Sequence, residues 1–170
     1  DNIVHVAGKV DPIADIETIG TELALADLAS VEKAIIREGK KAKSGDKDAQ
    51  KLVAIMERLQ AHLDQGLPVR SAGLDEDELL IIKPLCLLTV KPAMYVANVA
   101  EDGFANNPFL DALTELASKE GAPVVAVCAA MEAEIADLDD ADKTEFLQEM
   151  GLAEPGLNRL IRAGYDLLGL

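Results

Sequence analysis

Apolar residues at helical spacing fill the first third of the chain and are interrupted by one short polar turn. The pattern predicts a helix from about residue 13 to 43, with Asp11 as its N-cap and Pro12 at its first position. After the turn Ser44-Gly45-Asp46, it predicts a second helix over about 47–64. The short turn and the apolar spacing predict an antiparallel coiled-coil hairpin. The apolar positions are Ile16, Ile19, Leu23, Ala26, Leu28, Val31 and Ile35, then Leu52, Met56, Leu59 and Leu63.

Two short apolar runs farther along the chain predict strands that stop at polar or small residues. The first runs from Met94 to Ala97 and stops before Asn98. The second covers residues 123–127 and stops before Cys128. A predicted helix follows each strand, as in open α/β sheets, which bind ligands at the carboxyl ends of their strands. We therefore expect the two strand ends to lie side by side and to form one pocket.

Capping and turn residues predict the remaining helices. We expect them at about 75–83, 107–119, 130–137, 140–150 and 154–168. Residues 1–10 are expected to end a strand that lies mostly upstream. The predicted fold class is therefore α/β and rich in helix.

The charge is distributed unevenly over the 170 residues. The formal net charge is −15, yet the segment 33–58 carries +4, which leaves −19 for the rest. We expect the first half of the long helix to pack on a sheet and its basic second half to leave the body. The basic segment is either a solvated helical hairpin or an arm that binds a polyanion such as RNA. The candidate RNA-binding residues are Arg37, Lys40, Lys41, Lys43, Lys47 and Lys51.

Few residues suggest other chemistry. Cys86 and Cys128 lie in apolar, strand-like settings and are interpreted as reduced core thiols, with a loop-facing thiol as the alternative for Cys128. His5 and His62 have no companion ligands nearby in the sequence, so we predict no metal site. No Ser/His/Asp constellation is apparent, and the apolar run 79–99 is too interrupted to cross a membrane.

Several motifs in one order resemble the YchF/Obg-like ATPase family of P-loop NTPases, in the translation-factor class. They are Asp11-Pro12, Thr21-Glu-Leu-Ala-Leu-Ala-Asp27, Asn98-x-x-Glu101, Asp102-Gly103-Phe104, Cys128-Ala-Ala-Met-Glu-Ala-Glu134 and Glu154-Pro-Gly-Leu-Asn-Arg-Leu-Ile-Arg-Ala-Gly-Tyr165. The resemblance implies a partial P-loop domain over 1–27 and 67–170, with a helical hairpin inserted at 28–66. It also implies a cytoplasmic, ribosome-associated ATPase, and the basic hairpin is the candidate contact with ribosomal RNA.

The resemblance implies a nucleotide-base site at the two strand ends. Guanine-specific relatives carry N-K-x-D, whereas here Val99 and Glu101 replace the Lys and the Asp. A longer Glu side chain does not meet the guanine edge in the same geometry, while backbone groups near Val99 are able to read adenine. The implied ligand is ATP with Mg²⁺, in preference to GTP. The implied base-site residues are Asn98, Val99, Glu101, Cys128, Ala129 and Ala130.

The family's phosphate-binding loop, G-x-x-x-x-G-K-[ST], does not occur in this sequence. Gly8-Lys9 is followed by Val10, and Ile3 stands where the first Gly is required. The C-terminal β-rich domain of the TGS type is missing as well. We therefore interpret the chain as an internal piece with its Mg²⁺ ligands upstream, and expect no activity from the piece alone. Two alternatives stay open, a true GTPase and a non-enzymatic helical adaptor.

Overall fold

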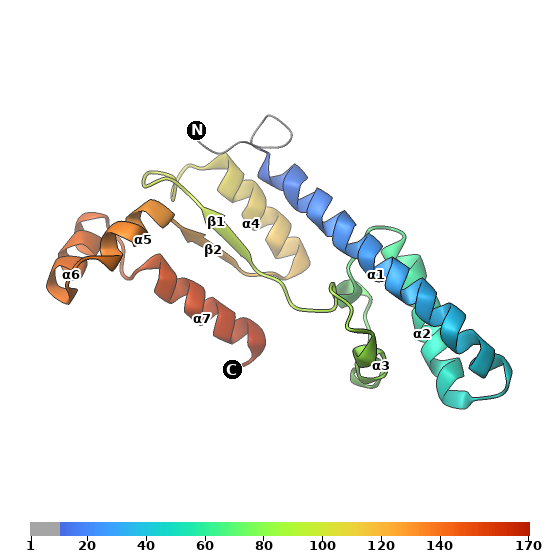
Figure 1. Cartoon of the computed structure of the whole chain (residues 1–170). Coiled ribbons are helices and arrows are strands. Elements are labelled where there is room, and N and C mark those ends of the chain that lie inside the picture. The colour runs from blue at the N-terminus through green and yellow to red at the C-terminus, as the bar shows by residue number, and fades with distance from the viewer. Residues whose placement is uncertain (1–10) are drawn as a thin grey trace. The chain divides into compact units, whose positions relative to one another are not determined.

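Residues 11–170 are described by the computed structural model of the chain, which divides into two units between Lys91 and Pro92. Helices make up most of both units, and a small parallel sheet lies in the second (Figure 1). The strand expected to end within residues 1–10 lies outside the described residues.

The first unit is built on two long helices, α1 (Pro12–Lys43) and α2 (Lys47–Leu63), which pack side by side (Figure 1). The carboxylate of Asp11 caps α1 by accepting a hydrogen bond from the Ala14 N–H at 3.3 Å. The chain then reverses through three residues, so α2 returns along α1. Both predicted helices are confirmed, while coiled-coil packing between them stays a prediction. The unit also contains η1 (Val69–Ser71), α3 (Glu76–Ile82) and η2 (Lys83–Leu85).

The buried face of α1 differs from the predicted one in the first half of the helix. Ile19 and Leu23 are 60% and 41% exposed, whereas Ala24 and Asp27 are buried. The buried face thus includes Asp27, whose carboxylate accepts hydrogen bonds from Leu88 and Thr89. Farther along, the predicted seam residues belong to the hydrophobic core, fully buried at Val31, Met56, Leu59 and Leu63 and partly buried at Leu28, Ile35 and Leu52.

Asp27 joins α1 to a segment sixty residues later in the chain. Its carboxylate accepts hydrogen bonds from the Leu88 N–H at 2.7 Å, the Thr89 N–H at 2.7 Å and the Thr89 hydroxyl at 2.6 Å. The Thr89 hydroxyl oxygen in turn accepts from the Val69 N–H at 2.9 Å. Three donors satisfy a carboxylate that is only 2% exposed, as a buried charge requires. Asp27 therefore fixes the return path of the chain across the helical pair.

Cys86 is not the core thiol that the sequence indicated. It is exposed, and it follows η2 with a backbone φ of 50°. The left-handed conformation directs the chain out of the short helix, and the neighbouring Leu87 fills the core instead. The strand-like interpretation of this segment is therefore wrong.

The second unit contains two parallel strands, each followed by a helix. Strand β1 (Tyr95–Asn98) pairs with β2 (Val124–Val127), in a register that places Asn98 opposite Val127. Both strands confirm the prediction; β1 begins and ends one residue later than expected, and β2 begins one residue later. The helices are α4 (Pro108–Glu120), α5 (Ala129–Ala136), α6 (Asp140–Glu149) and α7 (Gly156–Leu168).

Replacement of Asp27 by Asn tests this account of the first unit. The Asn amide would place an NH₂ group against N–H donors, so we expect a loss of about 2–4 kcal/mol in the free energy of unfolding. Urea denaturation of the 170-residue chain measures it. Asp64→Asn, at an exposed position after α2, is the matched control. Equal stability of Asp27→Asn and the control would show that the three hydrogen bonds do not hold the unit together.

Candidate functional site

The carboxyl ends of β1 and β2 meet through one side-chain hydrogen bond. The Asn98 Oδ1 atom accepts the N–H of Ala129 at 3.0 Å, across 31 residues of sequence. One residue after β1, the Val99 N–H donates to the Val127 carbonyl at 2.8 Å and extends the ladder. The structure thus places the two strand-end segments side by side, as the sequence predicts, and Asn98 links them.

The segment after β1 is a compact loop with a free carboxylate. The Gly103 N–H donates to the Ala100 carbonyl at 2.8 Å, and the Asn107 Nδ2 donates to the Gly103 carbonyl at 2.9 Å. A Cβ at Gly103 would lie 3.1 Å from the Ala100 nitrogen and oxygen, so the turn favours glycine. Glu101 is exposed and has no side-chain partner among residues 11–170. Its carboxylate is therefore available to a ligand.

The backbone near Val99 is only partly available to read a base. Its N–H is already engaged with Val127. A contact with adenine would have to use the Val99 carbonyl or a neighbouring amide. The expected recognition of adenine by the backbone is therefore limited to the Val99 carbonyl and the neighbouring amides.

The segment after β2 combines one buried side chain with two small exposed ones. Cys128 is 3% exposed, which agrees with the core-thiol interpretation. Ala129 and Ala130 open helix α5 and are exposed. Their small side chains are thus exposed at the edge of the sheet where the two strands end.

Glu132 and Arg159 belong to the same region and were not predicted as site residues. The Glu132 carboxylate accepts hydrogen bonds from the Gly156 N–H at 2.6 Å and the Leu157 N–H at 3.2 Å. The guanidinium of Arg159 lies 5.9 Å from the centre of the Phe104 ring, and its Nε and Nη2 atoms are buried without a hydrogen-bond partner. In the sequence, Pro155-Gly156 begins a helix without a side chain that can cap it. This signal could have indicated that a distant side chain accepts the first N–H groups of the helix.

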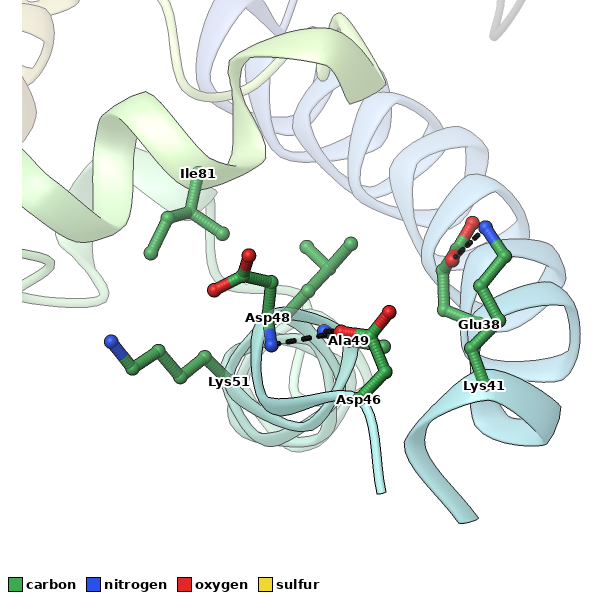
Figure 2. Close-up of a pocket in the computed structure, with 8 residues that line it drawn as sticks. Glu38, Lys41, Asp46, Asp48, Ala49, Lys51 and Ile81 are labelled. Atoms are coloured by element: carbon green, nitrogen blue, oxygen red, sulfur yellow. Dashed lines mark hydrogen bonds and ion pairs between the residues drawn. The ribbon is translucent and has the colours of Figure 1, made fainter. Parts of the chain in front are cut away.

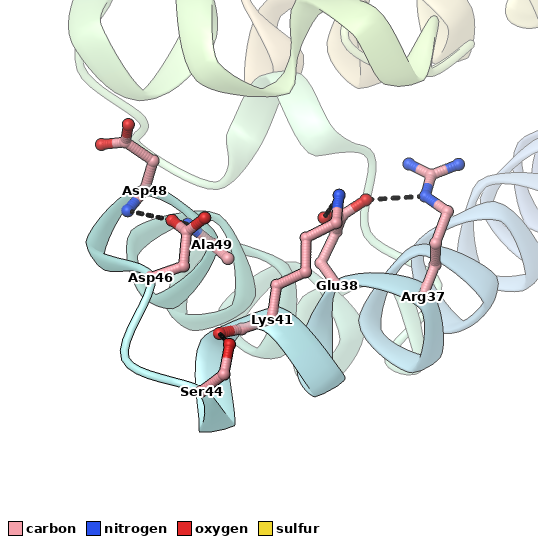
Figure 3. A network of polar contacts seen from close by, with 7 residues as sticks. All are labelled: Arg37, Glu38, Lys41, Ser44, Asp46, Asp48 and Ala49. Atoms are coloured by element: carbon pink, nitrogen blue, oxygen red, sulfur yellow. Dashed lines mark hydrogen bonds and ion pairs between the residues drawn. The ribbon is translucent and has the colours of Figure 1, made fainter.

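The basic residues of α1 and α2 form a second candidate site at the tip of the helical pair. Glu38 accepts from Arg37 Nε at 2.7 Å and from Lys41 Nζ at 2.8 Å (Figure 3). These hydrogen bonds, first from Lys41 and then from Arg37, hold the pKa of the Glu38 carboxyl below its ordinary value. Two of the six candidate cations are thus paired. The exposed lysines without a carboxylate partner in the described part of the chain are Lys40, Lys43, Lys47 and Lys51.

An open pocket beside the tip mixes charges of both signs (Figure 2). Lys41 and Lys51 line it together with the carboxylates of Glu38, Asp46 and Asp48. Asp46 is also the N-cap of α2, because its Oδ1 accepts from the Asp48 and Ala49 N–H groups at 3.0 Å each (Figure 3). Three carboxylates against two cations make the pocket unsuitable for a phosphate. The unpaired lysines are the better candidates for polyanion contact.

Neither metal ligation nor a membrane span is indicated within residues 11–170. No group of three or more His, Cys, Asp or Glu side chains is arranged to hold a metal ion there. No helix in that range combines the length and the apolar character needed to cross a bilayer.

Comparisons with known proteins agree on one relationship along the whole chain. The ribosome-binding ATPase YchF of Haemophilus influenzae is 61% identical over 170 residues, and that of Bacillus subtilis is 49% identical over 173, each match covering 100% of this chain and 47% of the relative. The solved structure of the Schizosaccharomyces pombe YchF GTPase matches with a TM-score of 0.85 and 27% identity, covering 99% of this chain and 47% of that one. No protein-family model matches the chain.

Fold and comparisons together define a helix-rich α/β segment with a small parallel sheet. The chain belongs to the YchF family; its bacterial relatives are named ribosome-binding ATPases and the Schizosaccharomyces pombe protein is named a GTPase. It spans about half the length of the curated relatives that it matches. The sequence resemblance to this family is thereby confirmed.

The ion pairs of Glu38 predict a defined pH dependence of stability. The folded-state pKa is lowered from 4.5. The pairs therefore contribute stability above that pH, and the contribution is lost as the pH falls through the lowered value. We expect Glu38→Gln to be less stable than the wild type at neutral pH and the difference to vanish in acid. Urea denaturation across this range measures it, with the exposed Glu57→Gln as control. A difference that is independent of pH would contradict the prediction.

Proposed function

We propose that this chain supplies the base-recognition side of the nucleotide site in a P-loop ATPase that acts on the ribosome. The hydrogen bond between Asn98 Oδ1 and the Ala129 N–H is the observation that carries the proposal, because it builds one surface from two strand ends. Such an edge is where open α/β sheets bind nucleotides. The names of the bacterial relatives, ribosome-binding ATPases, support the same activity for the whole protein.

The residues at this edge fit a purine base better than a phosphate group. An exposed amide at Asn98, a free carboxylate at Glu101 and small side chains at Ala129 and Ala130 offer polar contacts and a flat surface. Among the described residues, no carboxylate cluster is arranged to hold Mg²⁺. In this proposal, Mg²⁺ and the phosphates of ATP are therefore bound by parts of the protein outside this sequence, where the metal would supply charge stabilisation for phosphoryl transfer. The 170-residue chain alone is accordingly proposed to be inactive.

ATP is the proposed substrate, with GTP as the second candidate. Glu101 stands where guanine-specific proteins have Asp, and Val99 stands where they have Lys. A carboxylate displaced by one methylene loses its paired contact with guanine, and such losses change discrimination by orders of magnitude. The Schizosaccharomyces pombe relative is named a GTPase, which is the observation in favour of GTP.

The tip of the helical pair is proposed to contact ribosomal RNA in the cytoplasm. Lys40, Lys43 and Lys47 are exposed and lack carboxylate partners in the part of the chain that the structure describes. Lysines of this kind bind phosphates by releasing counterions. The rest of the chain is strongly acidic, and screening beyond about 8 Å at physiological salt lets the tip act on its own.

The proposed base site is tested by restoring the guanine-type residues. In the full-length protein, the double variant Val99→Lys, Glu101→Asp is expected to shift the ratio of ATP to GTP affinity toward GTP by about tenfold or more. Titration calorimetry with both nucleotides measures the ratio. Glu145→Asp, an exposed change on α6, is the control. An unchanged ratio would mean that these two side chains do not read the base.

The proposed RNA contact is tested by reversing three of the four unpaired charges. The triple variant Lys40→Glu, Lys43→Glu, Lys47→Glu should weaken ribosome binding, and its log–log salt slope should flatten by roughly 0.7–0.9 for each lost phosphate contact. Cosedimentation of the full-length protein over a salt series measures both. A control with the same charge change uses the exposed lysines Lys83, Lys91 and Lys119. If both triple variants bind alike, the tip is only a solvated surface.

A further inference from the structure

Helix α7 begins without a cap of its own, and Glu132 provides one from α5. The N-cap residue is Pro155, which makes no side-chain hydrogen bond. The first N–H groups of a helix have no acceptor inside it. The Glu132 carboxylate accepts two of them, Gly156 N–H at 2.6 Å and Leu157 N–H at 3.2 Å. A carboxylate there also interacts favourably with the positive end of the helix dipole.

The contact at Gly156 is tight enough to fix the position of α7. A Cβ at Gly156 would lie 2.8 Å from Glu132 Oε1 and 3.0 Å from Val127 Cγ1. Val127 is the last residue of β2. The start of α7 is therefore held between the end of β2 and the first turn of α5, and no larger residue fits without movement.

The same helix reaches the segment that follows β1. Arg159, three residues after Gly156, places its guanidinium 5.9 Å from the centre of the Phe104 ring. Phe104 belongs to the loop that contains Glu101. Helix α7 thus contacts the segments after both strands, while Asn98 joins them directly at Ala129.

We propose that Glu132 is a positioning residue for the nucleotide base. By capping α7, it holds the segment 128–130 at a fixed spacing from Asn98 and from the Glu101 loop. Both carboxylate oxygens of Glu132 accept hydrogen bonds from the start of α7. Glu132 therefore affects base binding by holding this arrangement and does not contact the base. The inference rests on the proposed function of the strand-end edge as a base site.

The test uses the full-length protein and separates the base from the phosphates. Adenosine reports on the base side of the site, inorganic tripolyphosphate with Mg²⁺ on the phosphate side, and ATP on both. Glu132→Ala is expected to weaken adenosine and ATP binding by about tenfold and to leave tripolyphosphate binding unchanged. Glu132→Gln retains one acceptor oxygen but places an NH₂ group against the second N–H donor, so a loss smaller than that of Glu132→Ala is expected. Glu134→Ala removes an exposed carboxylate from the same helix and is the matched control.

A second variant tests the same role in case Glu132→Ala does not fold. Gly156→Ala retains the Glu132 side chain but forces it to shift, because the added Cβ would lie 2.8 Å from Glu132 Oε1. The same selective loss of adenosine affinity is therefore expected. If the wild type binds adenosine and both variants bind it as tightly as Glu134→Ala does, the positioning role is overturned while the base site stands. If Glu132→Ala and Gly156→Ala weaken tripolyphosphate binding as much as they weaken adenosine binding, the effect is not specific to the base. The positioning role is then also overturned. If the wild type binds neither ATP nor adenosine, the proposed function fails and this role fails with it.

Discussion

The parallel pairing of two four-residue strands is the constraint on which the candidate site depends. Parallel strands end at the same edge of a sheet, and the register that sets Asn98 opposite Val127 makes β1 and β2 end level. A single amide side chain is then able to span the gap, from Asn98 Oδ1 to the Ala129 N–H at 3.0 Å. A shift of register would separate these atoms and divide the surface into two unrelated loops.

In both units a carboxylate connects segments that are far apart in the sequence: the buried Asp27 in the first and the partly buried Glu132 in the second. Asp27 receives three hydrogen bonds from Leu88 and Thr89, and Glu132 receives two from the start of α7. In each case a charged acceptor meets backbone N–H groups that would otherwise lack a partner, which makes the bond stronger than a neutral one. The helices provide the bulk of each unit, and these carboxylates determine where the connecting segments lie.

Local patterns were sufficient to predict most elements. Spacing, caps and turns gave the helices and both strands to within a few residues, because these signals act over one or two turns. The position of the two strand ends side by side followed from α/β topology. The partners of Asp27 and Glu132 did not, since they lie 61 and 24 residues away. Periodicity likewise reported an apolar face at Ile19 and Leu23 without showing that the buried face would turn toward Asp27.

Photolabelling of the full-length protein with an azido-adenine analogue of ATP tests the base site most directly. The label attaches to whatever lies against the purine ring, whichever groups bind the phosphates. The account predicts labelled peptides from residues 95–104 and 128–132, protected by unmodified ATP. Protected labelling confined to other parts of the protein, with these two segments unlabelled, would contradict it.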